Sequence, residues 1–359
     1  PAIAYRRVSR MKDVNCPVCD QHNYLPLFTA CDRLHGIEGE FTLVRCQECS
    51  LVFLNPQPSA DELKAHYPPS YDLHQNYHIA ERRGFRRQLR NAILRKYLGY
   101  PLEVELSGWR GLVASLVTPI LKSRLASFPP FRAGRSNRIL DIGCGSGEHL
   151  CVLKTLGWQV YGVEPNAQAC GIGREKGLDI HCGDLMSAQF PPDFFDRIRY
   201  WHVLEHVPNP RAELIESRRL LKDDGILHIA VPVFDMLPAK FFGQDLYSIE
   251  APRHLALYTR RSLRLLCEET GFEIRRLRFH YGTNVFVTSL CYVYETISGH
   301  RLTTRQKLRC MNGANSRTVN SLSTLGLFLL HKFSAPWCWL LRTIRQGDVI
   351  EIECSRTPG

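Results

Sequence analysis

The chain has 359 residues, and its 46 Lys and Arg against 35 Asp and Glu leave a net charge of +11 at neutral pH. With 44% hydrophobic and 23% charged residues it can bury a core, which excludes a disordered, collagen-like or coiled-coil chain. The longest mainly apolar runs, 112–121 and 325–330, fall short of the roughly 20 residues that a membrane-spanning helix needs. No export signal is evident, so we expect a cytoplasmic protein of more than one domain.

Two pairs among the 14 cysteines share one spacing. Cys16 and Cys19 form a C-x2-C pair, Cys46 and Cys49 form another, and 26 residues separate the two. Such pairs supply the four thiolates of a tetrahedral zinc site, which is structural because no coordination position stays open. The gap exceeds the roughly 15 to 20 residues usual between such pairs, so we expect a longer hairpin there. The alternative is two pairs of buried thiols without metal; the other cysteines are predicted to be reduced.

The chain is predicted to consist of three segments. They are a zinc-ribbon-like domain at 1–58, a helical linker or lid at 59–136, and an α/β domain at 137–355 with a helical insertion at about 284–347. A strand at 51–54 ends the first segment, because Pro56 and Pro58 then interrupt it. In the linker we predict helices at 81–98 and 109–127.

From residue 137 onward, short apolar stretches alternate with amphipathic ones, which is typical of a parallel α/β sheet. The predicted strands are 138–142, 159–163, 179–182, 195–200, 226–231, 272–278 and 348–354. Asn209 can cap a helix that runs from Pro210 to Leu221 and stops at 223–225, and Thr259 can cap another that ends at Gly271. We therefore predict a Rossmann-like α/β domain with a seven-stranded sheet.

The first of these strands leads into a turn with the pattern D-x-G-x-G-x-G. The turn consists of Asp141, Gly143, Gly145 and Gly147, with Cys144 between the first two glycines. Glycines allow the backbone to approach a ligand closely at the start of a helix. The spacing differs from the dinucleotide pattern G-x-G-x-x-G, and a carboxylate here would repel a pyrophosphate but attract an ammonium group.

Acidic residues also follow the next two strands. Glu164 stands where a carboxylate can accept both ribose hydroxyls of a nucleoside, and Asp184 precedes the apolar Leu185, a pair suited to an adenine ring. Three acids at successive strand ends, together with the glycine turn, resemble the class I S-adenosylmethionine-dependent methyltransferases over about 137–283. The alternative is an ordinary α/β domain with turn glycines.

The resemblance implies S-adenosylmethionine as the cofactor and assigns residues to its parts. Asp141, Gly143 and Gly145 would line the methionine part, Glu164 would hold the ribose, and Asp184 and Leu185 would frame the adenine. Cys144, Gly147 and Trp201 complete the predicted cofactor-binding set.

The segment after the fourth predicted strand holds Trp201, His202, Glu205 and His206. Read alone, H-x-x-E-H is an inverted zinc-protease signature. The family resemblance instead implies a loop at the carboxyl edge of the sheet, where doubly wound folds bind ligands. The segment resembles the small-molecule branch of the family, which includes the quinone-biosynthesis O-methyltransferases. That likeness implies a divalent ion bound by His202, Glu205 and His206. The alternative is that Glu205 and His206 have a structural role and only fix the loop.

Methyl transfer to a hydroxyl or a carbon acid also requires the loss of a proton, and a histidine suits that work. His206, His254 and His202 are the candidates, and the first two rank highest because each lies in a predicted loop. A purely structural role is the alternative for each of them.

A basic run at 82–96 carries Phe85, Leu89 and Ile93 at helical spacing. Like charges four residues apart weaken a helix, and a nearby anion would relieve this. A phosphate-bearing acceptor or the acidic inner face of a membrane would serve, and a solvated helix face is the alternative. The stretch 322–341 is predicted to be a packed or interfacial helix pair. The oligomeric state does not follow from the sequence.

The order of a C-x2-C segment, a Tyr- and Pro-rich linker and this domain resembles a bacterial group tied to saccharide or cell-envelope biosynthesis. Our leading hypothesis is a small-molecule methyltransferase acting on oxygen or carbon of a sugar, sugar nucleotide or lipid-linked saccharide. A quinone-type O-methyltransferase and an RNA methyltransferase are alternatives. Trp201 and His202 stand in place of the Asn/Asp-Pro-Pro-aromatic segment of base-amine methylating enzymes, which argues against nucleic acid. A non-catalytic binding protein is a further alternative, because Arg197 and Arg199 interrupt a central strand.

Overall fold

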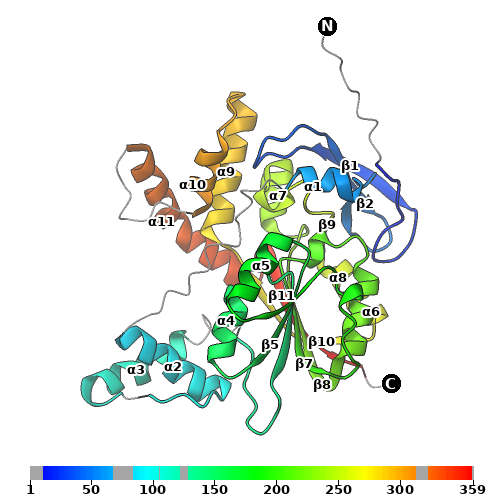
Figure 1. Ribbon diagram of the computed structural model, residues 1–359. Helices are drawn as coiled ribbons and strands as arrows, with labels where there is room; N and C mark the ends of the chain where they lie inside the picture. The colour runs from blue at the N-terminus through cyan, green and yellow to red at the C-terminus, as the bar shows by residue number, and fades with distance from the viewer. Residues whose placement is uncertain (1–10, 68–83, 105, 122–127, 313–321, 358–359) are drawn as a thin grey trace. The chain divides into compact units, whose positions relative to one another are not determined.

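The computed structural model describes residues 11–67, 84–104, 106–121, 128–312 and 322–357 (Figure 1). The chain divides into two compact units. The first unit comprises 1–71, 201–215 and 228–359, and the second unit comprises 72–200 and 216–227. The domain boundaries expected from the sequence stay a prediction.

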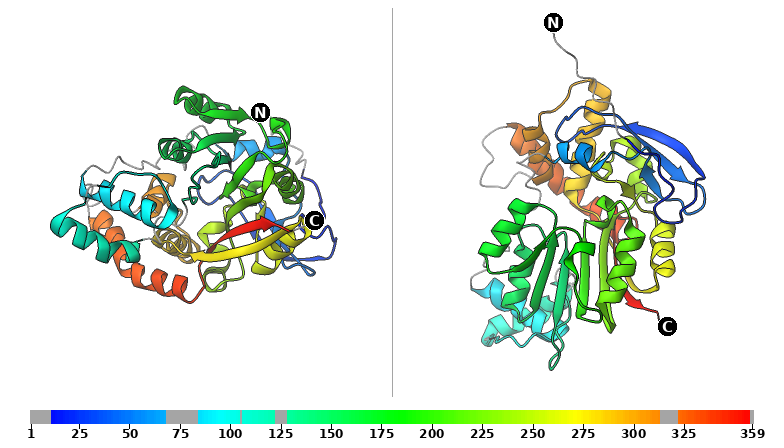
Figure 2. Two further views of the ribbon diagram at one scale, coloured as in Figure 1. Left: turned by 90° about the horizontal axis from the view of Figure 1, so that it is seen from below. Right: turned by 45° about the vertical axis from the view of Figure 1, so that its right-hand side comes forward.

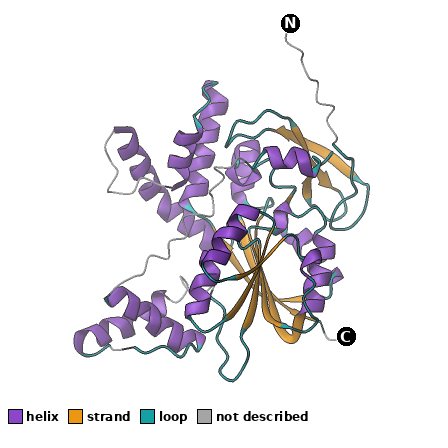
Figure 3. Cartoon of the chain, viewed as in Figure 1, coloured by secondary structure: helices purple, strands orange, loops and turns teal. Residues whose placement is uncertain are grey.

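Strands and helices alternate along the second unit (Figure 3). Its elements are α2 (Phe85–Leu98), α3 (Gly108–Leu121), β4 (Arg138–Ile142), α4 (Glu148–Thr155), β5 (Gln159–Glu164), α5 (Ala167–Glu175), β6 (Asp179–Cys182), the 3-10 helix η2 (Met186–Ala188) and β7 (Phe195–Trp201). β4 pairs in parallel with β5 and β7, and β5 pairs in parallel with β6. Leu150 and Leu153 of α4 pack with Ile139 of β4 and Ile180 of β6 in one buried cluster. These strands agree with the predicted ones to within one residue at each end.

The sheet continues through β8 (Leu221–Pro232), β11 (Val349–Arg356) and β10 (Phe272–His280), and its full order is β10-β11-β8-β7-β4-β5-β6. β10 and β11 are antiparallel. The prediction of a Rossmann-like α/β fold with seven strands is confirmed. β8 begins earlier than the predicted residue 226, directly after α6 (Pro210–Leu220). The predicted stop at 223–225 is therefore wrong: the helix ends at Leu220, and 223–225 belong to β8, with Asp223 and Asp224 exposed and the buried Leu220 and Leu221 at the junction of the two elements.

The first unit also contains several helices. They are α1 (Ala60–Ala65), α7 (Leu237–Phe242), α8 (Arg260–Glu269), α9 (Thr283–Ser298), α10 (Thr304–Asn312) and α11 (Leu322–Thr343), with 3-10 helices η3 (Leu204–His206), η4 (Gly243–Asp245) and η5 (Tyr247–Ile249). Thr259 caps α8 as predicted, since its side chain accepts a hydrogen bond from the backbone of Ser262. The predicted insertion consists of α9, α10 and α11, drawn in gold to red-orange in Figure 2. Among the described residues, no helix is long and apolar enough to span a bilayer.

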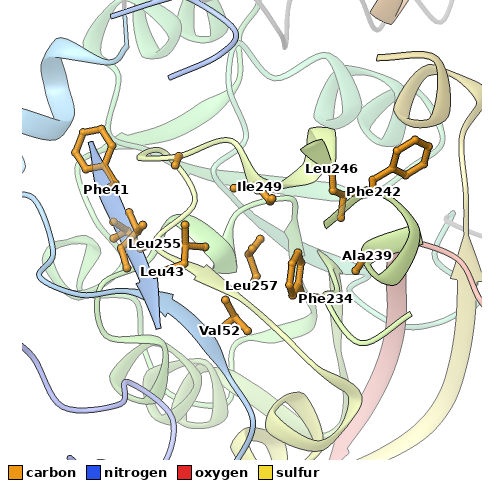
Figure 4. Packing of buried hydrophobic residues seen from close by; sticks show 12 residues of the cluster. Phe41, Leu43, Val52, Phe234, Ala239, Phe242, Leu246, Ile249, Leu255 and Leu257 are labelled. Atoms are coloured by element: carbon orange, nitrogen blue, oxygen red, sulfur yellow. The ribbon is translucent and has the colours of Figure 1, made fainter. Parts of the chain in front are cut away.

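A second sheet joins the N-terminal strands to a short strand from much later in the chain. β1 (Tyr24–Ala30), β2 (Phe41–Cys46), β3 (Val52–Leu54) and β9 (Ala256–Leu257) pair in this order. Val52 is the partner of Leu257, and Phe53 is the partner of Ala256. Figure 4 shows the apolar cluster around this pairing, in which Phe41, Leu43 and Val52 lie among residues of the range 234–257. The N-terminal strands thus share one core with β9.

A buried ion pair lies in the same region. Arg253 and Asp32 are 0% and 2% exposed, and their side chains meet at 2.7 Å (Nη1 to Oδ2) and 3.3 Å (Nη2 to Oδ1). Arg253 also donates to the carbonyl of His66, whose ring lies 3.1 Å from Asp32. Burial alone would raise the pKa of Asp32, but the Arg253 guanidinium has the larger, opposite effect. The pKa of Asp32 therefore lies below its ordinary value. The pair is therefore ionised and connects the N-terminal segment to the segment before β9.

We expect the Arg253→Met variant to lose about 3 to 5 kcal/mol of unfolding free energy, because Asp32 would keep a buried charge without its partner. Arg275→Met is the matched control, since Arg275 and Glu273 form an ion pair with both side chains about half exposed. That pair should contribute less than about 1 kcal/mol. Urea unfolding followed by fluorescence measures both values, and similar small losses in the two variants would contradict this role for Arg253.

Candidate active site

The turn between β4 and α4 consists of residues that accept a left-handed backbone. Gly143, Gly145 and Gly147 have φ values of +63°, +56° and +79°, at which a side chain would be strained. At Gly147 an added Cβ would also lie 2.1 Å from Leu178 Cδ1, so packing excludes a side chain there. Cys144 is partly buried in this turn, and burial raises the pKa of its thiol. The three glycines therefore keep side chains out of the turn before α4, as the close approach of a ligand to the backbone requires.

Glu164, the last residue of β5, is bonded to this turn. Its Oε2 accepts a hydrogen bond from the amide of Gly145 at 2.9 Å, and its Oε1 accepts one from the amide of Asn166 at 2.8 Å. The residue is 9% exposed. A carboxylate held at both oxygens beside the glycine turn fits the predicted ribose-binding role, which stays a prediction.

Asp141 has a partner that the sequence analysis did not foresee. Both of its carboxylate oxygens accept hydrogen bonds from Nη1 of Arg199, at 2.8 and 3.0 Å, and both residues are buried. The two residues face each other in the parallel pairing of β4 with β7. Arg199 is thus the counter-charge of a buried acid, so it no longer argues against a functional sheet. The positive charge of Arg199 also offsets the negative charge of Asp141, which weakens the attraction of Asp141 for an ammonium group.

Asp184 and Leu185 follow β6 as expected, but their environments differ. Asp184 is exposed, and its Oδ1 accepts a hydrogen bond from the amide of Ser187 at 2.8 Å. Hydrogen bonds from the Ser187 side chain and backbone lower the pKa of Asp184, so it is ionised at neutral pH. Leu185 is 1% exposed and packs inward. Contact of these residues with an adenine ring stays a prediction.

In the first unit, the loop after β7 carries a histidine paired with a carboxylate. The side chain of His202 is 39% exposed, and its Nδ1 lies 3.4 Å from Oε1 of Glu205, which is fully buried. Burial alone would raise the pKa of Glu205, but the three neighbouring histidines, His202 most strongly and then His206 and His254, together lower it below its ordinary value. Glu205 is therefore ionised. His202 has a φ of +55°, and its amide donates to the carbonyl of Ala230 in β8. The ring of Trp201 lies 6.0 Å from that of His202.

His206 and His254 lie together, and His254 is buried whereas His206 is half-buried. Their ring centroids are 4.7 Å apart, His206 Nδ1 lies 2.9 Å from the carbonyl of Arg253, and His254 Nδ1 lies 2.7 Å from that of Ser248. Burial, with a smaller contribution from His254, lowers the pKa of His206 to about 4. His206 is therefore neutral at physiological pH.

The potential metal ligands in this region differ from the expected set. Within the described parts of the chain, Glu205, His206 and His254 have ligand atoms within 4.8 Å of one another, whereas His202 is outside this group. His254 comes from a segment nearly fifty residues further along the chain, so its place beside His206 could not be read from local spacing.

A further buried carboxylate at this edge of the sheet was missed from the sequence. Asp348 immediately precedes β11, is 1% exposed and accepts a hydrogen bond from Ser248 Oγ at 2.9 Å. Its carbonyl accepts from the amide of Val233, which follows β8. Burial raises its pKa to about 7. No local sequence pattern predicts the burial of an aspartate directly before a strand, so the sequence held no signal for it.

The four cysteines of the N-terminal segment come together through two similar turns. Asp20 and Ser50 each follow a C-x2-C pair, have φ values of +57° and +65°, and donate an amide hydrogen bond to the carbonyl of Cys16 or Cys46. The four Sγ atoms lie within 4.8 Å of one another, with Cys16 to Cys49 at 3.4 Å and Cys19 to Cys46 at 3.5 Å. Tetrahedral zinc with bonds of about 2.3 Å separates its sulfur ligands by about 3.8 Å, so these residues fit the ion.

The family comparison agrees with this fold and turn. Residues 115–277 match the family model described as "Methyltransferase domain". The match, the strand order and the glycine turn together define the class: the chain contains a class I S-adenosylmethionine-dependent methyltransferase domain. The matched residues include 138–199, which carry the turn and the acids at the carboxyl ends of β4, β5 and β6.

Curated relatives resemble parts of this domain. "Ubiquinone biosynthesis O-methyltransferase" of Glaesserella parasuis serovar 5 (strain SH0165) is 34% identical over 104 residues, 26% of this chain and 44% of that protein. An uncharacterized protein of Mycobacterium tuberculosis (strain ATCC 25618 / H37Rv) is 28% identical over 170 residues, 45% of this chain and 56% of that protein. The chain thus spans about half the length of the curated relatives it matches.

Solved structures align over larger shares of the chain but less closely. The "[4+2]-Cyclase SpnF" is 19% identical with a TM-score of 0.40, covering 77% of this chain and 93% of that one. A "SAM dependent methyltransferase from Archaeoglobus fulgidus" is 17% identical with a TM-score of 0.41, covering 69% of this chain and 100% of that one. The assignment of the fold rests on the strand order and the family match.

We expect the Glu164→Gln variant to bind S-adenosylmethionine roughly 10- to 100-fold more weakly, the equivalent of losing charge-assisted hydrogen bonds of about 1.5 to 3 kcal/mol. Titration calorimetry measures the affinity. Glu175→Gln is the control, because Glu175 is exposed at the end of α5. Unchanged affinity in a folded Glu164→Gln protein would remove Glu164 from the cofactor site.

Proposed function

We propose that this chain transfers the methyl group of S-adenosylmethionine to an oxygen or carbon atom of a small-molecule acceptor, with a hydroxyl of a sugar, sugar nucleotide or lipid-linked saccharide as the leading class. The observation that carries the proposal is the pairing of His202 with Glu205 directly after β7. That loop follows the carboxyl end of a parallel strand, where doubly wound folds bind their ligands.

Bound S-adenosylmethionine supplies an electrophilic methyl carbon on a sulfonium. The chain's own residues align the two reactants and accept the proton of the hydroxyl. The short approach of His202 Nδ1 to the ionised Glu205 keeps the ring proton on Nδ1, which leaves the lone pair of Nε2 to take the acceptor proton. Glu205 then stabilises the imidazolium that forms. His206, held neutral by burial, is proposed to support the loop that carries the pair.

The acceptor class is supported from two directions. The saccharide hypothesis is based on the resemblance of the N-terminal cysteine segment and linker to a group tied to saccharide biosynthesis. A quinone-type phenol is the second candidate, because several curated relatives are named "Ubiquinone biosynthesis O-methyltransferase". Both acceptors present a hydroxyl, so both would use the same base. RNA is a third candidate, supported by the net charge of +11.

Incubation with labelled S-adenosylmethionine and, in parallel, nucleotide sugars, lipid-linked saccharides, phenolic quinone precursors and total RNA tests this proposal. We expect incorporation into a saccharide, and into none of the RNA. With the accepted substrate, His202→Asn should lower kcat roughly a hundredfold or more, because the proton has no acceptor. Affinity for S-adenosylmethionine should stay unchanged.

The exposed His300 provides the matched control, and His300→Asn should keep the wild-type kcat. Incorporation into RNA alone would overturn the acceptor class. A wild-type kcat in His202→Asn would remove His202 as the base while leaving methyl transfer intact.

The proposal includes a structural zinc ion at Cys16, Cys19, Cys46 and Cys49. A hydrogen bond with Cys49 lowers the pKa of the Cys16 thiol to about 6, and the same contact raises the pKa of Cys49, so without an ion this pair carries one thiolate. Four thiolates brought together without an ion would repel one another, and the ion would hold the two turns against β2 and β3.

Elemental analysis should find about one zinc per chain, as one four-thiolate site requires. The double variant Cys16→Ser, Cys46→Ser should lose the metal and unfold the N-terminal sheet at a lower temperature, since removing ligands removes the binding energy. Cys182→Ser is the control, because Cys182 is exposed and distant in sequence from both pairs. A folded wild-type protein without metal would exclude the zinc site.

A further inference from the structure

Helix α11 presents an unusual row of exposed apolar side chains. Leu329, Phe333, Trp337, Leu340 and the following Ile344 recur at spacings of four, four, three and four residues, which places them along one helix face. They are 42%, 78%, 49%, 40% and 49% exposed. Contiguous large apolar groups on a protein surface mark a site of interaction, whereas scattered single ones do not.

The packing of α11 fixes which way this row faces. Ser334, Cys338 and Leu341 are 5%, 3% and 2% exposed and lie on a different face of the helix. Cys338 and Leu341 form a buried cluster with Tyr281, and His331 bonds to Thr283 at the start of α9. Within the first unit, α11 is therefore anchored by one face and cannot turn its exposed row inward without losing these contacts.

The charged residues of 322–345 are all of one sign, because this stretch includes no Asp or Glu, whereas Lys332, Arg342 and Arg345 are exposed. Lys332 precedes Phe333 and borders the exposed row, whereas Arg342 follows Cys338 by four residues and lies toward the anchored face. Trp339 is also 60% exposed, so two tryptophans and a phenylalanine accompany the cations. A helix with Trp, Phe and Leu on one face, flanked by Lys and Arg, has the composition of helices that lie in a membrane interface. A second copy of the chain would oppose like charges across the contact.

We propose that this face of α11 binds the surface of an anionic lipid bilayer. Phe333, Trp337 and Leu340 enter the boundary between headgroups and acyl chains, and the cations meet the headgroup phosphates. The inference is independent of methyl transfer, because it concerns a surface and not the site after β7. Binding to a bilayer would bring the enzyme close to a lipid-linked acceptor.

Co-flotation of the full chain with vesicles tests the proposal. We expect binding to vesicles of phosphatidylcholine mixed with phosphatidylglycerol, and weak binding to phosphatidylcholine alone. The double variant Phe333→Ser, Trp337→Ser should bind roughly tenfold or more weakly to the mixed vesicles. Each of Lys332→Gln and Arg345→Gln should lower binding about fivefold, and only on anionic lipid.

Leu25→Ser is the matched control, since Leu25 is a 58% exposed apolar residue on β1, and it should bind as the wild type does. Circular dichroism establishes that each variant is folded. The proposal is overturned if folded wild-type protein floats with neither vesicle, or if the double variant and the Leu25→Ser variant bind equally. It is also overturned if sedimentation shows that the wild-type protein is a dimer and the double variant a monomer, because this face of α11 would then bind a second copy of the chain.

Discussion

The first unit depends on one buried guanidinium. Arg253 has no contact with water, so its charge must be matched by partners inside the protein, and the N-terminal segment supplies them through Asp32 and the carbonyl of His66. The next residue, His254, packs against His206, whose Nδ1 meets the carbonyl of Arg253 itself. The N-terminal strands, completed by β9, are therefore part of the structure that positions these histidines.

Buried acids in this protein fall into two groups. Asp141 is matched by Arg199 across two paired strands, and Glu351 is matched by His228, His280 and Arg278. Glu205 is as deeply buried, yet neither of its carboxylate oxygens accepts a hydrogen bond from a described residue, and its neighbours are three histidines: His202 at 3.4 Å, and His206 and His254 with ligand atoms within 4.8 Å. A buried charge so weakly compensated is costly, and such groups concentrate where chemistry or binding uses them. This contrast underlies the role proposed for the loop after β7.

The two proposals concern separate surfaces and converge on one type of acceptor. A hydroxyl on a lipid-linked saccharide would be presented near a bilayer, and a cationic, aromatic face on α11 would keep the enzyme at that surface. Neither proposal needs the other. A soluble sugar nucleotide would satisfy the first alone, and a quinone precursor, being apolar, would also be found at a membrane.

Short-range patterns of apolar residues, glycines and strand ends were enough to predict the seven-stranded fold, the glycine turn and the acids at the ends of β4, β5 and β6. The spacing of the cysteines also predicted that the two C-x2-C turns come together. Three arrangements emerged in the folded structure alone: Arg199 neutralises Asp141, His254 joins Glu205 and His206 in place of His202, and Asp348 is buried. These arrangements join segments far apart in the chain, and strand register and burial, which no local pattern encodes, determine them.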